Sequence, residues 1–123
     1  MIVIFLLMIL CHILDDFVLQ PVCLSNLKQK RWWDEHCYGK QYNNDYKMAL
    51  FIHSLSWSIM IHLPIIFLLF PYGLLLTLSI LINMTIHYIV DDLKANKYKI
   101  NLITDQSIHF IQIIVTFIIF IMI

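Results

Sequence analysis

Residues 1–20, MIVIFLLMILCHILDDFVLQ, begin with eleven apolar residues and then place a histidine and two aspartates before the apolar run ends. An apolar run of about this length predicts a helix that can cross a membrane. Ionisable side chains inside such a helix are costly, so they usually serve a function. This stretch therefore predicts both a membrane-spanning first helix and a polar site near its end.

The composition of the whole chain agrees with that prediction. The 123 residues are 61% hydrophobic and only 13% charged, whereas soluble domains carry about a quarter charged residues. The apolar residues lie in long blocks, which is typical of membrane spans and not of a soluble core. Eight basic residues are offset by eight acidic ones, so nothing suggests nucleic-acid binding. Membrane lipid is the expected partner, and a homo-oligomer is an open alternative.

Four apolar segments follow one another along the chain. The predicted helices cover about residues 1–20, 48–70, 74–91 and 105–123, joined by a polar interfacial loop at 21–47 and a short loop at 92–104. Each segment has roughly 17 to 23 residues, which is enough for a membrane-crossing helix. The predicted fold is therefore all-α: one integral membrane domain over residues 1–123, built as a four-helix transmembrane bundle.

The basic residues indicate how this bundle is oriented. Every lysine and arginine lies in the loops at 21–47 and 92–104, which face the same side of a four-span chain. The other side, with Met1, the FPYG turn at 70–73 and Ile123, has none. The positive-inside rule then places the two loops in the cytosol and both termini on the non-cytoplasmic side of the cytoplasmic (inner) membrane.

The loop at 21–47 is polar but carries several aromatic residues. Trp32, Trp33 and Tyr38 lie close to lysines, which is most simply an interfacial anchor at the depth of the lipid headgroups. The alternative is that the loop forms a lid over a site on the cytoplasmic side, because loops often carry function.

Each predicted helix carries one histidine near its cytoplasmic end. Three of these histidines have an aspartate four residues away, always on the cytoplasmic side, and residues four apart share one face of a helix. The pairs are His12/Asp16, His87/Asp91 and Asp105/His109, while His53 in the second helix stands alone. This pattern predicts two stacked polar layers, with the histidines deeper and the aspartates nearer the cytosol.

Histidine nitrogens and carboxylate oxygens are suitable ligands for zinc, and also for iron or manganese. The predicted ligands of such a divalent metal ion are His12, His53, His87 and His109. Asp16, Asp91 and Asp105 are the predicted catalytic residues, and Gln20, Lys94 and Gln106 are predicted to bind substrate. Asp15 and Asp92 are interpreted as solvated or helix-end neighbours, and His62 as a hydrogen-bonded packing residue.

A bound metal ion can activate water as a nucleophile. The sequence therefore favours a metal-dependent hydrolase acting on an ester or phosphoester of a lipid-like or membrane-adjacent substrate. Two alternatives stay open: a relay or transporter of protons or metal ions, and a non-enzymatic phage or prophage accessory protein whose polar layer is structural. Transport is less well supported because the outer halves of three helices are almost free of polar groups.

Four motifs carry a resemblance to a known family: HILDDFVLQ at 12–20, ALFIHSL at 49–55, HYIVDDLK at 87–94 and DQSIHF at 105–110. With these motifs the chain resembles the domain of unknown function 3307 family, small membrane proteins of bacteria and their phages. The resemblance touches all four predicted helices, so it implies the same architecture and the same set of polar residues. It implies no reaction. The chain is more loosely similar to small membrane proteins labelled metal-dependent hydrolases.

Overall fold

A computed structural model describes residues 1–20, 22–69 and 73–122. Of the described residues, 86% are helical, and none of them forms a strand. Within them lie six α-helices, a π-helical turn η1 and a 3₁₀ turn η2. Their bounds are α1 Ile2–Ile13, η1 Leu14–Val18, α2 Val22–Leu27, α3 Lys30–His36, η2 Lys40–Tyr42, α4 Asp45–Leu69, α5 Gly73–Ala95 and α6 Leu102–Ile121.

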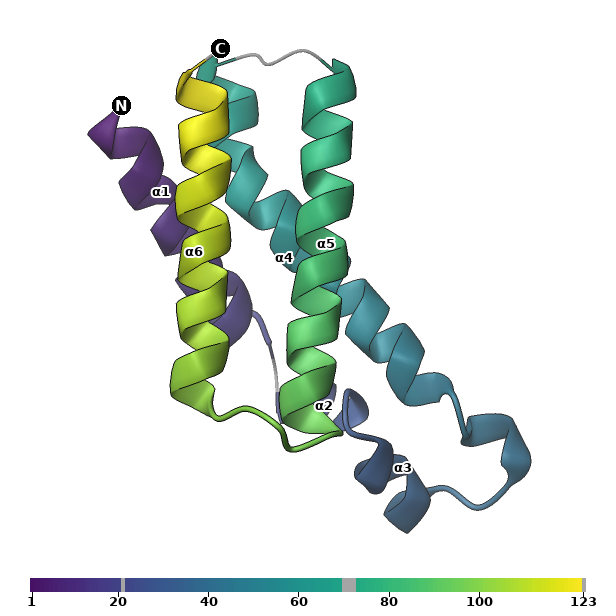
Figure 1. Cartoon of the computed structure of the whole chain (residues 1–123). Helices are drawn as coiled ribbons and strands as arrows, with labels where there is room; N and C mark the ends of the chain where they lie inside the picture. The colour runs from purple at the N-terminus through teal and green to yellow at the C-terminus, as the bar shows by residue number, and fades with distance from the viewer. Residues whose placement is uncertain (21, 70–72, 123) are drawn as a thin grey trace.

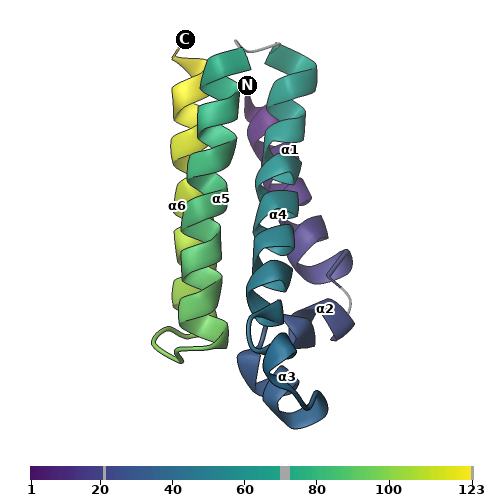
Figure 2. The same ribbon diagram turned by 90° about the vertical axis from the view of Figure 1, so that its right-hand side faces the viewer.

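Four helices form the bundle. α4 packs against α1 and α5, and α6 packs against α5 and α1. α4 crosses the bundle obliquely in Figure 1, while α5 and α6 stand nearly upright beside it. The beginning of α1 and the end of α6 lie at one end of the molecule, and α2 and α3 lie at the other in both views (Figures 1 and 2). We call this second end, formed by residues 22–44 and 96–101, the loop end.

Three helical stretches within the described residues are long and apolar enough to cross a membrane: Lys40–Leu69, Gly73–Ala95 and Leu102–Ile121. Their outward faces carry exposed apolar side chains such as Ile82, Ile111 and Ile119, while the interior holds histidines and aspartates. This arrangement suits helices that are surrounded by lipid, because only their inner faces can shelter polar groups. The all-α class and the presence of helices able to span a membrane are thus confirmed.

The first predicted span is shorter than the other three. α1 has 12 residues and continues into the five residues of η1, where the Leu19 N–H bonds to the Leu14 carbonyl oxygen at 2.7 Å. At about 1.5 Å per residue this stretch measures about 25 Å, against about 30 Å for the hydrocarbon core of a bilayer. The crossing of a membrane by residues 1–20 therefore stays a prediction.

The loops differ from their predicted bounds. The loop predicted at 21–47 contains α2 and α3, and α4 begins at Asp45, whose carboxylate suits a helix N-terminus. The loop predicted at 92–104 narrows to 96–101. The reason is local, since the Asn101 side chain accepts a hydrogen bond from the Thr104 N–H at 2.9 Å and caps α6. Of the FPYG turn only Gly73 lies among the described residues.

The buried interior has two parts. An apolar core occupies the end away from the loop end and contains Ile4, Met8, Trp57, Ile61, Ile65, Ile113 and Phe120. Between this core and the loop end lies a second region in which the buried side chains are mostly histidines and aspartates. We call this second region the polar layer. Because most of the buried ionisable side chains of the described residues lie in the polar layer, it is the candidate for a functional site.

Candidate metal centre

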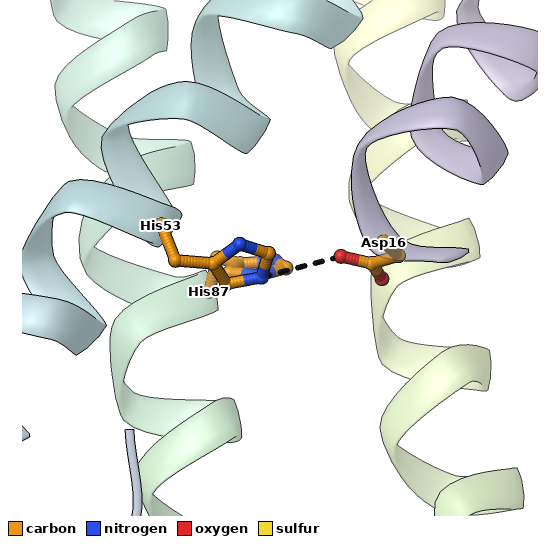
Figure 3. A group of neighbouring side chains, drawn as sticks. All are labelled: Asp16, His53 and His87. Atoms are coloured by element: carbon orange, nitrogen blue, oxygen red, sulfur yellow. Dashed lines mark hydrogen bonds and ion pairs between the residues drawn. The ribbon is translucent and has the colours of Figure 1, made fainter. Parts of the chain in front are cut away.

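Two clusters of side chains in the polar layer have the composition of a metal site. Within the described residues, each cluster places three potential ligand atoms within 4.8 Å of one another. Asp16, His53 and His87 form the first ligand group, which Figure 3 shows with the two imidazoles facing the carboxylate from across the bundle. His87, Asp91 and His109 form the second ligand group. Residues from η1, α4, α5 and α6 thus converge, as the sequence pattern predicts.

The distances within the ligand groups are close to those between neighbouring ligands of a metal ion. His53 Nε2 lies 3.3 Å from Asp16 Oδ1 and 3.2 Å from His87 Nε2. His109 Nε2 lies 3.5 Å from Asp91 Oδ1. Most of these separations exceed the usual N–H···O distance of about 2.9–3.0 Å. They fit the edge of a tetrahedron, about 3.3 Å, that follows from metal–ligand bonds of about 2.0–2.1 Å.

Several potential ligand atoms have no hydrogen-bond partner. Asp16 Oδ1, Asp105 Oδ1 and His109 Nε2 are buried and unpaired in the part of the chain that the structure describes. Leaving such an atom without a partner costs about 1–3 kcal/mol. Asp105 Oδ1 lies 3.5 Å from His109 Nε2, next to the second ligand group. Cations bound within the polar layer would supply the missing partners of these atoms.

The orientation of His109 is determined by its neighbours. The Gln112 Nε2 amide donates to the Asn83 carbonyl oxygen at 3.1 Å, so Gln112 Oε1 is the atom that faces His109 Nδ1 at 3.1 Å. His109 therefore carries a proton on Nδ1. In the neutral ring, the Nε2 lone pair then points at the carboxylates of Asp91 and Asp105. Such an outer hydrogen bond is the usual way in which a metal-binding histidine is held in place.

His12 is held differently from the other three histidines. The Trp57 indole donates from Nε1 to His12 Nδ1 at 2.8 Å, and an indole N–H can only donate. His12 Nδ1 is therefore an acceptor, and its Nε2–H donates to Gln106 Oε1 at 3.1 Å. Both ring nitrogens are used, and His12 belongs to neither ligand group. Its predicted role as a metal ligand stays a prediction.

Trp57 is a central residue that the sequence reasoning missed. Its ring stacks on His87, with ring centroids 4.3 Å apart and an interplanar angle of 23°. It lies four residues after His53, so the same spacing rule that paired His87 with Asp91 would have placed it on the inner face of α4. Trp57 thus connects His12 and His87, and it closes the polar layer toward the apolar core.

Asp15 corrects one prediction. Instead of being solvated or a helix-end neighbour, it is buried, and its Oδ1 accepts a hydrogen bond from Ser56 Oγ at 2.7 Å. The physical reason is η1, because a π-helical turn has more residues per turn than an α-helix and so brings both consecutive aspartates inward. Asp92 does lie near the end of α5 as predicted. Its ion pair with Lys97 raises the pKa of that lysine.

Two lysines neutralise part of the polar layer. Lys28, which follows α2, is only 5% exposed, and its Nζ lies 2.7 Å from Asp91 Oδ2 and 3.3 Å from Gln20 Oε1. Lys94 Nζ lies 2.6 Å from Asp105 Oδ2. No periodicity in the sequence indicates Lys28. Its position depends on the fold of residues 22–36, which Asn96 holds by donating from Nδ2 to the Lys28 carbonyl oxygen at 3.1 Å.

The charges of the described polar layer do not balance. Its four carboxylates are Asp15, Asp16, Asp91 and Asp105, and its ammonium groups are those of Lys28 and Lys94. With all four carboxylates ionised and the histidines neutral, two negative charges are left uncompensated. Buried charges are unfavourable unless they are paired. One divalent cation, or two additional protons on the histidines, would restore neutrality.

A pocket of about 320 Å³ leads from the loop end to the polar layer. The three predicted substrate-binding residues line it together with Lys28 and two aspartates: Gln20, Lys94, Gln106, Lys28, Asp16 and Asp91. Gln106 also donates from Nε2 to Asp105 Oδ2 at 3.0 Å and to Asp16 Oδ2 at 3.4 Å, so it connects two carboxylates. The pocket thus brings together the predicted substrate-binding residues and two of the three predicted catalytic residues, Asp16 and Asp91.

Polar contacts also extend past the polar layer into the bundle. Asn83 Nδ2 donates to Thr116 Oγ1 at 2.9 Å, and His62 bonds through Nε2 to Ser79 Oγ at 2.8 Å and through Nδ1 to the Ser58 carbonyl oxygen at 2.6 Å. His62 is thus a hydrogen-bonded packing residue, as predicted. Polar side chains from α4, α5 and α6 thus continue the hydrogen-bonded interior past the polar layer.

The family model described as "Protein of unknown function (DUF3307)" matches residues 4–123. The chain therefore belongs to this family, and the resemblance found in its motifs is confirmed over nearly the whole length. No curated protein and no solved structure matches the chain.

Proposed function

Because membership of this family assigns no reaction, we propose a function from the geometry of the polar layer. The chain is a multi-pass protein of the cytoplasmic membrane with its loop end in the cytosol. Its polar layer binds at least one divalent metal ion: zinc, iron or manganese. With this metal it hydrolyses an ester or phosphoester bond in a lipid-like or membrane-adjacent substrate.

One observation carries the metal site. Two buried atoms without a hydrogen-bond partner among the described residues each face a potential ligand atom at 3.3–3.5 Å: Asp16 Oδ1 lies opposite His53 Nε2, and His109 Nε2 lies opposite Asp91 Oδ1. A purely structural network would close these contacts to ordinary hydrogen-bond distances, because buried polar groups in proteins are almost always paired. The uncompensated negative charge of the polar layer supports the same conclusion.

The chain's own residues divide into three roles. His53, His87 and His109, with Asp16 and Asp91, hold the metal, and Gln112 orients His109 through its Nδ1. When bound, the metal activates a water molecule as a nucleophile near neutral pH. His12 acts through Gln106 and positions the carboxylate of Asp16.

The pocket indicates an amphiphilic substrate. Lys28, Lys94 and Gln20 lie on its polar side, where an anionic head group would meet ammonium groups. Phe17 and Leu102 line the same pocket, and each is more than half exposed. An apolar substituent could therefore extend past them into the surrounding lipid while the polar head reaches the metal.

A relay of protons or metal ions is the second candidate, and the polar contacts that continue to His62 favour it. Between His109 and Ser79 this path runs through the side-chain amides of Gln112 and Asn83. Amides donate and accept hydrogen bonds, but they do not readily pass a proton onward. A relay predicts proton or metal flux across vesicles that contain the protein, whereas a one-sided hydrolase predicts none.

Metal content is the decisive measurement. Detergent-purified wild type should carry zinc, iron or manganese in near-stoichiometric amount by elemental mass spectrometry, and the double variant His87→Ala with His109→Ala should lose it. His62→Ala is the matched control, because His62 is equally buried but belongs to neither ligand group. It should retain the metal. Wild type without metal after metal-supplemented purification would overturn the proposal.

The reaction needs a second assay on the same samples. Hydrolysis of a chromogenic phosphoester and of a chromogenic carboxylic ester in mixed micelles should follow the metal content across the wild type and both variants. Metal-loaded protein that cleaves neither compound, nor a phospholipid or a lipid phosphate, would leave a metal site without hydrolase activity. That result would contradict the enzymatic part of the proposal.

A further inference from the structure

We infer that the polar layer holds two divalent cations joined by the carboxylate of Asp91, and that its substrate is a phosphoester rather than a carboxylic ester. This inference rests on the proposed function and deepens it. Its basis is the position of Asp91, whose two oxygens face different sets of ligand atoms.

Asp91 Oδ1 faces the second ligand group. It lies 3.5 Å from His109 Nε2 and 3.7 Å from His87 Nε2. Asp91 Oδ2 lies 3.6 Å from His53 Nε2, which belongs to the first ligand group. A carboxylate whose oxygens point to two neighbouring groups has the arrangement of a bridging ligand. The side chain is only 3% exposed, and Oδ2 also accepts a hydrogen bond from Lys28 Nζ at 2.7 Å, which leaves this oxygen a second lone pair for a cation.

His87 cannot bridge the two ligand groups as the carboxylate of Asp91 can. A ring nitrogen has one lone pair and binds one cation, whereas a carboxylate has two oxygens and can serve two. If His87 completes the second group, that group contains His87, His109 and Asp91 Oδ1, with Asp105 Oδ1 at 3.5 Å from His109 Nε2. The first cation would then be held by Asp16 Oδ1 and His53 Nε2, with Asp91 Oδ2 as the third ligand because it lies 3.6 Å from His53 Nε2. Each cation has at least three protein ligands.

Three of the five buried side-chain atoms that have no hydrogen-bond partner among the described residues lie at the two groups, which is the second observation. Asp16 Oδ1 belongs to the first group, and His109 Nε2 and Asp105 Oδ1 lie at the second. All three are buried without a hydrogen-bond partner among the described residues. A single cation in either group would leave at least one of these atoms unpaired, whereas two cations satisfy all three.

The charge of a two-cation centre predicts the class of substrate. Two divalent ions with Lys28 and Lys94 carry six positive charges against the four carboxylates of the polar layer. Two positive charges are left over, which matches a phosphomonoester dianion. The pocket that reaches Asp16 and Asp91 also exposes both lysines to such a ligand. A neutral carboxylic ester would leave this excess charge uncompensated.

Pairs of metal ions in phosphatases stabilise both the attacking and the leaving oxygen. In the proposed step the oxygen of a water molecule forms a bond to phosphorus, and the bond from phosphorus to the alcohol oxygen breaks. The electron pair of that bond stays on the alcohol oxygen, which takes up the proton released by the water. The products are inorganic phosphate and the free alcohol, so no further reactant is needed.

The test is a count of bound ions. Metal-free protein in detergent is titrated with Mn²⁺, and bound manganese per chain is measured by elemental mass spectrometry and by electron paramagnetic resonance. Wild type should bind two ions with the spectrum of an exchange-coupled pair. The matched variants His53→Gln and His109→Gln each remove a histidine that belongs to only one ligand group, and each should bind one uncoupled ion.

The outcomes separate this inference from the proposed function. One ion per chain in the wild type, or two without magnetic coupling, would overturn the bridged pair while leaving a metal site in place. No bound ion would overturn both. Because the wild-type count decides the matter by itself, the test does not depend on the folding of the variants. Inorganic phosphate serves as the substrate probe, and it should bind tightly only to protein that carries two ions.

Discussion

Replacing Asp16 by asparagine should change the stability of the protein in opposite directions without and with metal. Asp16 lies in η1 with its side chain 8% exposed, its Oδ1 is unpaired, and its Oδ2 accepts only a long bond of 3.4 Å from Gln106. A buried carboxylate without a counter-charge costs several kcal/mol. Asn keeps the shape and removes the charge, so the free energy of unfolding of the metal-free protein should rise by about 1 kcal/mol or more.

With metal present the same substitution removes a ligand. At a free metal concentration about 1,000 times Kd, binding stabilises the folded protein by about 4.1 kcal/mol. A 100-fold weaker affinity would leave about 1.4 kcal/mol of that stabilisation at the same concentration. The asparagine variant should therefore lose about 2.7 kcal/mol of the metal-dependent increase in unfolding free energy.

The assay is denaturant unfolding in detergent, followed by circular dichroism, with chelator or with saturating Zn²⁺. Asp92→Asn is the matched control, because it removes the same charge near the end of α5, where Asp92 pairs with Lys97 outside the polar layer. Neither condition should change its stability by much. A metal-ligand role for Asp16 would be refuted if Asp16→Asn lowered the unfolding free energy of the metal-free protein and zinc still stabilised the variant as much as it stabilises wild type. Asp16 would then be the partner of a protonated histidine and not a metal ligand.

Three further predictions concern the residues around the metal. Gln112→Leu removes the acceptor of the His109 Nδ1–H. Metal affinity should then fall about 10–100-fold in a chelator competition titration, because hydrogen-bond partners of metal ligands contribute about that much. An unchanged affinity would contradict the assigned orientation of the His109 ring. Trp57→Phe keeps an aromatic ring against His87 but removes the hydrogen-bond donor to His12 Nδ1. The free energy of unfolding, measured by denaturant unfolding, should fall by about 1–3 kcal/mol. A variant as stable as wild type would show that the indole hydrogen bond does not stabilise the fold. Protons compete with metal for histidine nitrogens, so metal retained after dialysis should decrease as the pH is lowered from about 7.5 to about 5.5; full retention at the lower pH would indicate that carboxylates alone hold the ion.

Part of the predicted loop at 21–47 lines the pocket, whereas its role as an interfacial anchor stays a prediction. Trp32 and Trp33 sit on the short helix α3, and Trp33 donates from Nε1 to the Leu27 carbonyl oxygen at 2.8 Å. The same segment delivers Lys28 into the pocket beside Asp91. Since Asn96 attaches this segment to the end of α5, a segment suited to the membrane interface also forms one wall of the site.

Local rules were sufficient for the helices and for most of the polar layer. Long apolar blocks specify helices because a lipid-exposed backbone must satisfy its hydrogen bonds internally, and this alone led to the all-α fold. The spacing of four residues in His87/Asp91 and Asp105/His109 was enough to place each pair on one inward face. These features depend only on neighbours within one helix, so they can be read from one segment at a time.

Tertiary structure decided which of these side chains meet. The indole of Trp57 on α4 donates a hydrogen bond to His12 Nδ1. The sequence pattern alone treated His12 as equivalent to the other histidines. The π turn at Leu14–Val18 brings Asp15 inward against the α-helical expectation, and the fold of residues 22–36 buries Lys28. Each of these outcomes depends on contacts between segments that are far apart in the chain. The sequence alone therefore specified the helices and the set of polar groups, whereas helix packing decided which of these groups lie close enough together to bind a metal ion.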